Sequence, residues 1–238
     1  LMLSGIGPAD HLASHGIEAV VANPNVGAHY QDHPFDLVNW ETSARGPRAE
    51  AGHPGQLLQF RLRGRGMRTS TVAEATAFFR SRPGLPAPDM QFHMGAAYFH
   101  NHGFDTHDKP AFVIAPTLVA PQSRGEIRLR SADPGEQPSI VGNHLTEAAD
   151  VDAMLAGMEL AREIAAQPRL AGTTGRELHP GEAARDRAAL THALRRETEL
   201  IYHPTSTARM GPSETSVVDA ALRVYGVDRL RVVDASVM

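Results

Sequence analysis

The longest regular pattern in the chain is an apolar stripe from Glu147 to Gln167, and this pattern predicts a long helix. Apolar residues recur three or four positions apart, which places them on one face of a helix. Thr146 is a favourable N-cap, and Pro168 ends the pattern because proline cannot continue a helix. The stripe consists of Val151, Met154, Leu155, Met158 and Ala161. Its methionines are therefore expected in the core.

Short strand patterns accompany this helix. Phe112 to Val119 is apolar and bounded by prolines, which predicts a buried strand, and Glu126 to Arg130 alternates like a half-buried one. An antiparallel sheet with flanking helices, of α+β or α/β class, is the simplest fold that contains them. Other expected elements are a helix from Pro8 to Gly16, a strand at Ile17 to Val21, a strand at Phe35 to Trp40, a helix at Gln56 to Leu62, a strand at Val72 to Phe79 and a helix from Asp186 to about Glu199.

Composition indicates a globular protein. Of 238 residues, 42% are hydrophobic, which suffices for one large or two small domains with a core. The net charge is −4 and the basic clusters are short, so nucleic acid is not an expected partner. No apolar run approaches the ~18 residues of a membrane span, and the first residues lack the pattern of a signal peptide. The absence of cysteine excludes disulfides and thiolate metal sites. We expect a cytoplasmic location.

A histidine in a tight turn is the clearest candidate for chemistry. His203 is followed by Pro204, which restricts the backbone, and by the hydroxyls of Thr205 to Thr207, which can bond nearby backbone groups. Such a loop can orient an imidazole, whose ordinary pKa of about 6.5 suits a general base. A purely structural histidine is the alternative that the residues alone leave open.

A second candidate lies near the end of the chain. Leu230 and Val232 alternate with polar neighbours, which predicts a strand that ends at Asp234, Ala235 and Ser236. Small side chains at such a strand end allow a ligand to approach closely, although a simple surface turn has the same composition.

Longer motifs around these residues resemble a known family. HPTSTARMG from His203, followed by SVVDAALRVYGVDRLRVVDASVM up to Met238, is similar to the C-terminal signature of the glucose-methanol-choline (GMC) flavoprotein oxidoreductases. SGIGP at Ser4, with the later PNVG and DHP, looks like the family's mid-chain segment, and PQSRGEIRLRSADP from Pro121 resembles another family stretch. The motifs stand in the family's order, and the resemblance covers nearly the whole chain.

The resemblance implies a division of the chain between two domains. Residues 1–35 and 200–238 would be incomplete pieces of a Rossmann-like FAD-binding domain. Residues 36–199 would form a substrate-binding domain of the FAD-linked reductase type, built on an antiparallel sheet with helices. The similarity is weakest from about Glu41 to Asp108, where family members differ most in the loops that shape the substrate pocket.

The resemblance also implies a reaction. A small-molecule alcohol would be oxidised to an aldehyde or ketone, with hydride passing to FAD and the hydroxyl proton to His203. Asp234 and Ala235 match a segment that runs beside the flavin. The alcohol itself and the electron acceptor, whether oxygen, a quinone or another molecule, stay open. The high content of alanine, arginine and glycine suggests a bacterial, choline-dehydrogenase-like enzyme.

The chain departs from the family pattern in ways that matter. Ser206-Thr207-Ala208 stands where Gly-Thr-Cys is commoner, so a turn with positive φ would carry strain of ~1 kcal/mol. No G-x-G-x-x-G dinucleotide motif occurs, and the family's second catalytic histidine or asparagine would follow Met238. We therefore expect a part of a longer flavoenzyme that is inactive alone.

Two other functions remain as alternatives to the enzyme. The chain could be a binding or docking module in which His203 is structural. Alternatively, a histidine-rich segment could bind a metal through His93, His100, His102 and His107. A metal needs three or four ligands with supporting partners, and this segment is more simply a pocket rim, so no metal is expected. A Ser-His-Asp hydrolase is disfavoured because no G-x-S-x-G motif marks a nucleophile.

Overall fold

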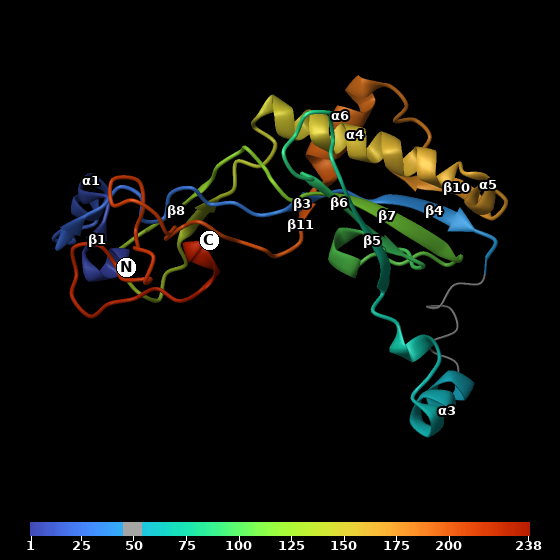
Figure 1. Cartoon of the computed structure of the whole chain (residues 1–238), viewed down its shortest axis with the longest axis horizontal. Coiled ribbons are helices and arrows are strands. Elements are labelled where there is room, and N and C mark those ends of the chain that lie inside the picture. The colour runs from blue at the N-terminus through green and yellow to red at the C-terminus, as the bar shows by residue number, and fades with distance from the viewer. Residues whose placement is uncertain (45–53) are drawn as a thin grey trace. The chain divides into compact units, whose positions relative to one another are not determined.

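The computed structural model describes residues 1–44 and 54–238, which form two compact units (Figure 1). Unit 1 contains Leu1–His33, Pro121–Glu147 and Tyr202–Met238, and unit 2 contains Pro34–Ala120 and Ala148–Ile201. The division expected from the sequence differs in one segment, since 121–147 belongs to unit 1 and not with residues 36–199.

Unit 2 is built on a seven-stranded antiparallel sheet. Strand β7 is central, because β3 and β4 pair with successive parts of one of its edges while β6 pairs with the other. Strand β10 extends the sheet beyond β4, β11 beyond β3, and β5 beyond β6. The strands are β3 Pro34–Phe35, β4 Val38–Thr42, β5 Ala73–Phe79, β6 Met90–Gly95, β7 Ala111–Leu118, β10 Thr174–His179 and β11 Glu199–Leu200.

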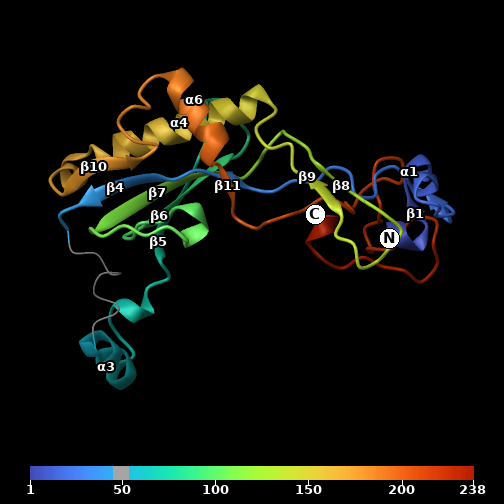
Figure 2. The ribbon, with the colours of Figure 1, turned by 180° about the vertical axis from the view of Figure 1, so that it is seen from behind.

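Helices cover one face of this sheet, where α4 and α6 lie together in both views (Figures 1 and 2). Met154 and Met158 of α4 are fully buried, which confirms that these methionines belong to the core. A Cβ at Gly157 would lie 2.8 Å from Met90 and Pro116, so the helix packs closely on β6 and β7. The helices of this unit are α3 Pro54–Arg63, η2 Met67–Thr69, η3 Asn101–Gly103, α4 Ala148–Ala165, α5 Pro168–Ala171 and α6 Arg187–Glu197.

Unit 1 has little regular structure and is held by a compact apolar core. The parallel pair β1–β2 and the antiparallel pair β8–β9 are its two small sheets. The fully buried side chains of Leu12, Val217 and Val218 lie in the core. Its elements are η1 Met2–Ser4, β1 Ile6–Gly7, α1 Ala9–Ser14, β2 Val21–Ala22, β8 Glu126–Arg128, β9 Ser139–Val141 and η4 Ala235–Val237.

Backbone hydrogen bonds explain why 121–147 joins unit 1. Ile127 N donates to Gly27 O at 2.7 Å, and Tyr30 and Gly125 exchange two bonds of 2.9 Å. A Cβ at Gly27 would lie 2.3 Å from Ile127 O, and its φ is +78°, so glycine is required where these segments meet. Residues 121–147 are therefore hydrogen-bonded to the first segment of unit 1, and this is why they group with that unit and not with the sheet of unit 2.

Most of the expected helices and strands are confirmed, including the long helix, the helix before His203 and the buried strand β7. The strand expected at Phe35 to Trp40 is interrupted and becomes β3 and β4. The prediction of a strand at Leu230 to Val232 was wrong, because the only β-pairing of the described backbone there is an isolated bridge between Arg223 and Arg231. Leu230 and Val232 still pack against the core of unit 1, so their alternation indicated burial without a sheet partner.

Among the described helices, none combines the length and the apolar character needed to cross a membrane.

Candidate functional site

Two His-Pro pairs that lie 170 residues apart in the sequence bring their imidazoles together in unit 1. Nδ1 of His203 lies 3.1 Å from Nδ1 of His33. The two rings meet edge to face, with centroids 5.1 Å apart and planes at 81°. His203 is exposed, so its imidazole is accessible to a ligand.

One buried carboxylate holds the backbone of both histidines. Asp32 is only 3% exposed, and its Oδ1 accepts hydrogen bonds from the backbone N–H of His33 at 2.7 Å and of His203 at 2.8 Å. Its Oδ2 accepts a longer bond of 3.4 Å from the hydroxyl of Tyr30. Asp32 thus fixes the two main chains from which the imidazoles project.

The loop after His203 is fastened to the segment that precedes Asp32. Gln31 and Thr205 exchange backbone hydrogen bonds of 3.2 and 2.9 Å. Gln31 Nε2 donates to Ser206 Oγ at 2.7 Å, and Ser206 Oγ donates to Met238 O at 2.7 Å. The loop is therefore fixed by both neighbouring segments and cannot change conformation independently of them.

Ser206 adopts a backbone conformation with positive φ, for which strain was expected in the absence of glycine. Its φ is +75°, in the left-handed region where glycine is favoured, and its side chain is buried. Two short hydrogen bonds from Gln31 and to Met238 compensate for this strain. The departure from glycine at this position is thus accommodated by contacts that glycine could not make.

Two variants at Ser206 separate the strain from the hydrogen bonds. Ser206→Ala keeps the unfavourable φ and loses both bonds, so we expect a loss of about 1–3 kcal/mol in the free energy of unfolding. Ser206→Gly loses the same bonds but relieves the strain, so it should be more stable than the alanine variant by about 1 kcal/mol. Urea unfolding of both variants measures the difference, and equal stabilities would show that the conformation is not strained.

The short Nδ1 to Nδ1 contact restricts the protonation of the pair. One nitrogen must donate and the other accept, so the two rings cannot both carry a proton at Nδ1. When His203 donates to His33, its own Nε2 carries a lone pair. The pair can therefore hold His203 in the tautomer that accepts a proton at Nε2.

The structure places Asp234 and Ala235 at exposed positions at the start of η4. Asp234 accepts hydrogen bonds from the hydroxyl and the backbone N–H of Ser236, and these bonds hold the pKa of its carboxyl below the ordinary value. This segment runs beside the loop after His203, because Ala208 N donates to Ser236 O at 2.9 Å. No contact joins Asp234 or Ala235 to His203 among the described interactions.

A hollow of about 510 Å³ opens next to this segment within unit 1. Val26, Thr207, Asp234 and Ser236 are among the residues that line it. Val233, which also lines it, is 72% exposed. The hollow thus offers both an anionic and an apolar contact to a ligand.

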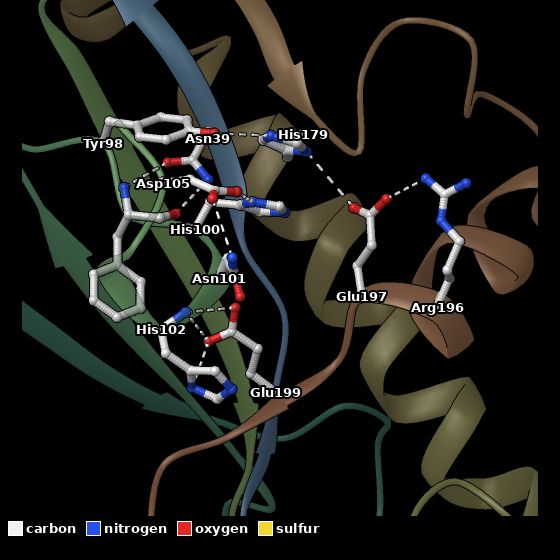
Figure 3. Close-up of polar contacts among 11 residues, drawn as sticks. Asn39, Tyr98, His100, Asn101, His102, Asp105, His179, Arg196, Glu197 and Glu199 are labelled. Atoms are coloured by element: carbon white, nitrogen blue, oxygen red, sulfur yellow. Dashed lines mark hydrogen bonds and ion pairs between the residues drawn. The ribbon is translucent and has the colours of Figure 1, made fainter. Parts of the chain in front are cut away.

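The four histidine side chains of the histidine-rich segment do not meet at one point. The ring of His102 lies 3.1 Å from Glu199, and that of His107 lies 3.4 Å from Glu41. His100 contacts Asp105 and His179 (Figure 3). His93 lies on β6. A metal site made of these four histidines therefore has no support in their contacts.

Sequence reasoning missed Asp32 and His33. Their DHP motif served to recognise a family segment, and no role was assigned to either side chain. The signal was nevertheless present, because His33-Pro34 repeats the His-Pro pair of the candidate loop. What the sequence could not give was their proximity to His203.

Comparisons with known proteins place these motifs in one family. The family model described as GMC oxidoreductase matches residues 121–238. A GMC-type oxidoreductase of Mycobacterium tuberculosis, itself uncharacterised, is 44% identical and aligns with 100% of this chain and 46% of its own length. Choline oxidase of Arthrobacter globiformis is 40% identical over 100% of this chain and 41% of its own length.

The fold agrees with the sequence comparison. The structure of a formate oxidase from Aspergillus oryzae, studied for FAD modification, superposes with a TM-score of 0.87 at 26% identity. It covers 100% of this chain, which in turn covers 47% of it. The chain spans less than half the length of the curated relatives described above. The α+β arrangement expected from the sequence is confirmed.

Proposed function

The chain belongs to the GMC oxidoreductase family, and from that premise we propose that it carries the catalytic base of a FAD-dependent enzyme that oxidises a small-molecule alcohol. The observation that carries the proposal is the exposed imidazole of His203, whose backbone is fixed by Asp32 and whose Nδ1 meets His33. The names of choline oxidase and formate oxidase support an oxidation with FAD as cofactor.

In this proposal His203 removes the proton of the substrate hydroxyl. In the tautomer in which Nδ1 of His203 donates to Nδ1 of His33, Nε2 of His203 is the atom that takes the proton. Asp32 holds both main chains, so the imidazole needs little reorganisation when the alcohol arrives. FAD, when bound, supplies the hydride acceptor.

The residues near the end of the chain fit one part of that cofactor. Asp234 is exposed and anionic, so it suits an N–H or O–H donor and would repel a pyrophosphate. The exposed Ala235 has a small side chain that permits close approach. We therefore assign Asp234 and Ala235 to the uncharged flavin or ribityl portion, while the phosphates need other residues.

Anaerobic reduction of the flavin tests the function directly. The protein that contains this chain, purified with FAD, should lose its visible flavin absorbance when mixed with a suitable primary or secondary alcohol, and an aldehyde or ketone should form in equal amount. A panel of alcohols of different size and charge would identify the substrate class. A flavin that no alcohol in the panel reduces, but that dithionite does, would contradict the proposal.

A further inference from the structure

Two histidines and a glutamate meet in unit 2, and none of the three is among the residues assigned to alcohol oxidation. His100 precedes η3, His179 ends β10 and Glu197 ends α6. The rings of His100 and His179 are stacked, with centroids 3.9 Å apart and planes at 9°. One potential ligand atom from each of the three residues lies within 4.8 Å of the other two (Figure 3).

The second nitrogen of each ring already has a partner. Nδ1 of His100 lies 2.7 Å from a carboxylate oxygen of Asp105, and Nε2 of His179 lies 3.0 Å from the hydroxyl of Tyr98. Nδ1 of His179 faces Glu197 at 3.6 Å. Metal-binding histidines typically use their other ring nitrogen in this way, because a carboxylate or hydroxyl there fixes the orientation of the imidazole.

We propose that His100, His179 and Glu197 form a binding site for Zn²⁺ or a similar divalent transition metal, with a fourth position left for water. Two imidazoles and one carboxylate are a donor set that suits zinc. Zinc bond lengths of about 2.0–2.1 Å place neighbouring donors roughly 3.3 Å apart. Because the lone pair of an imidazole lies in the plane of its ring, one of the two stacked rings must turn out of the stack before both can bind the same ion.

Binding would change one existing contact. Arg196 lies 2.5 Å from Glu197 Oε1, but the arginine side chain is 68% exposed and can turn into solvent. The site would connect η3, β10 and α6, which come from three distant parts of the sequence. The metal would therefore stabilise unit 2.

Cobalt titration of the metal-free protein tests the site without measuring oxidase activity. After dialysis against a chelator, one equivalent of Co²⁺ should give the visible absorption of a low-coordinate cobalt site, and Zn²⁺ should displace it. His179→Ala and Glu197→Gln should each weaken Zn²⁺ binding at least 100-fold. Asp105→Asn, which alters the partner of His100, should weaken it about 10- to 100-fold.

His192→Ala is the matched control, since it removes an exposed histidine from the same helix as Glu197. It should bind cobalt like the unchanged protein. Circular dichroism of each metal-free variant checks that it folds. Absence of cobalt binding, equal binding by the His179 and Glu197 variants, or a comparable loss in the His192 variant would overturn the proposal.

Discussion

Replacing His203 with alanine is expected to slow flavin reduction by alcohol about 100- to 10,000-fold while FAD stays bound. This range is what general base catalysis by a positioned side chain typically contributes. The variant removes the imidazole but keeps the backbone N–H that bonds to Asp32, so the loop should remain in place. Single-turnover flavin reduction under anaerobic conditions measures the chemical step, and the visible absorbance of the purified variant reports whether flavin is retained.

Two comparisons make this result specific to His203. His15→Ala removes another histidine of unit 1, one whose ring contacts only His11 among the described aromatic contacts, and should leave the rate unchanged. Added imidazole should restore part of the activity of the His203→Ala protein by occupying the vacated space. A His203→Ala enzyme with nearly normal rates would favour the alternative in which this chain is a docking module and His203 is structural.

The local structure was predictable where one segment contains its own signals. Val151, Met154 and Met158 recur at helical spacing, and Pro168 ends the pattern, so the long helix could be placed to within about two residues. By contrast, β11 has only two residues, and it is a strand because it pairs with β3 across the chain. No sequence window contains that partner, and the order of the sheet could not be read from the sequence for the same reason.

The same distinction between local signals and contacts made by the fold applies to the candidate site. His203 stood out because Pro204 and the hydroxyls after it form a local motif, and the family resemblance supported its role. Asp32 and His33 lie in a segment that is remote in sequence, and only the fold brings them within 3.1 Å of the loop. The trio of His100, His179 and Glu197 was hidden for the same reason, since the sequence drew attention to histidines that are close only along the chain.

Removing the carboxyl group of Asp32 should have the second-largest effect on catalysis. Asp32→Ala leaves the backbone N–H groups of His33 and His203 without their buried acceptor, so both main chains can shift. A displacement of about 1 Å at a catalytic group costs on the order of 100-fold in rate, and we expect kcat to fall by about that factor. The free energy of unfolding should also fall, by about 1–3 kcal/mol for each bond left unmade.

Asp32→Asn separates position from charge, because its amide oxygen can still accept both bonds at the place of Oδ1 while the negative charge is lost. If Asp32 acts by holding the two main chains, the asparagine variant should keep kcat within a few-fold of the unchanged enzyme and unfold at a similar urea concentration. An asparagine variant as slow as the alanine variant would mean that the charge near the histidine pair is essential. Full activity of Asp32→Ala would show that the geometry of His203 is maintained without this carboxylate.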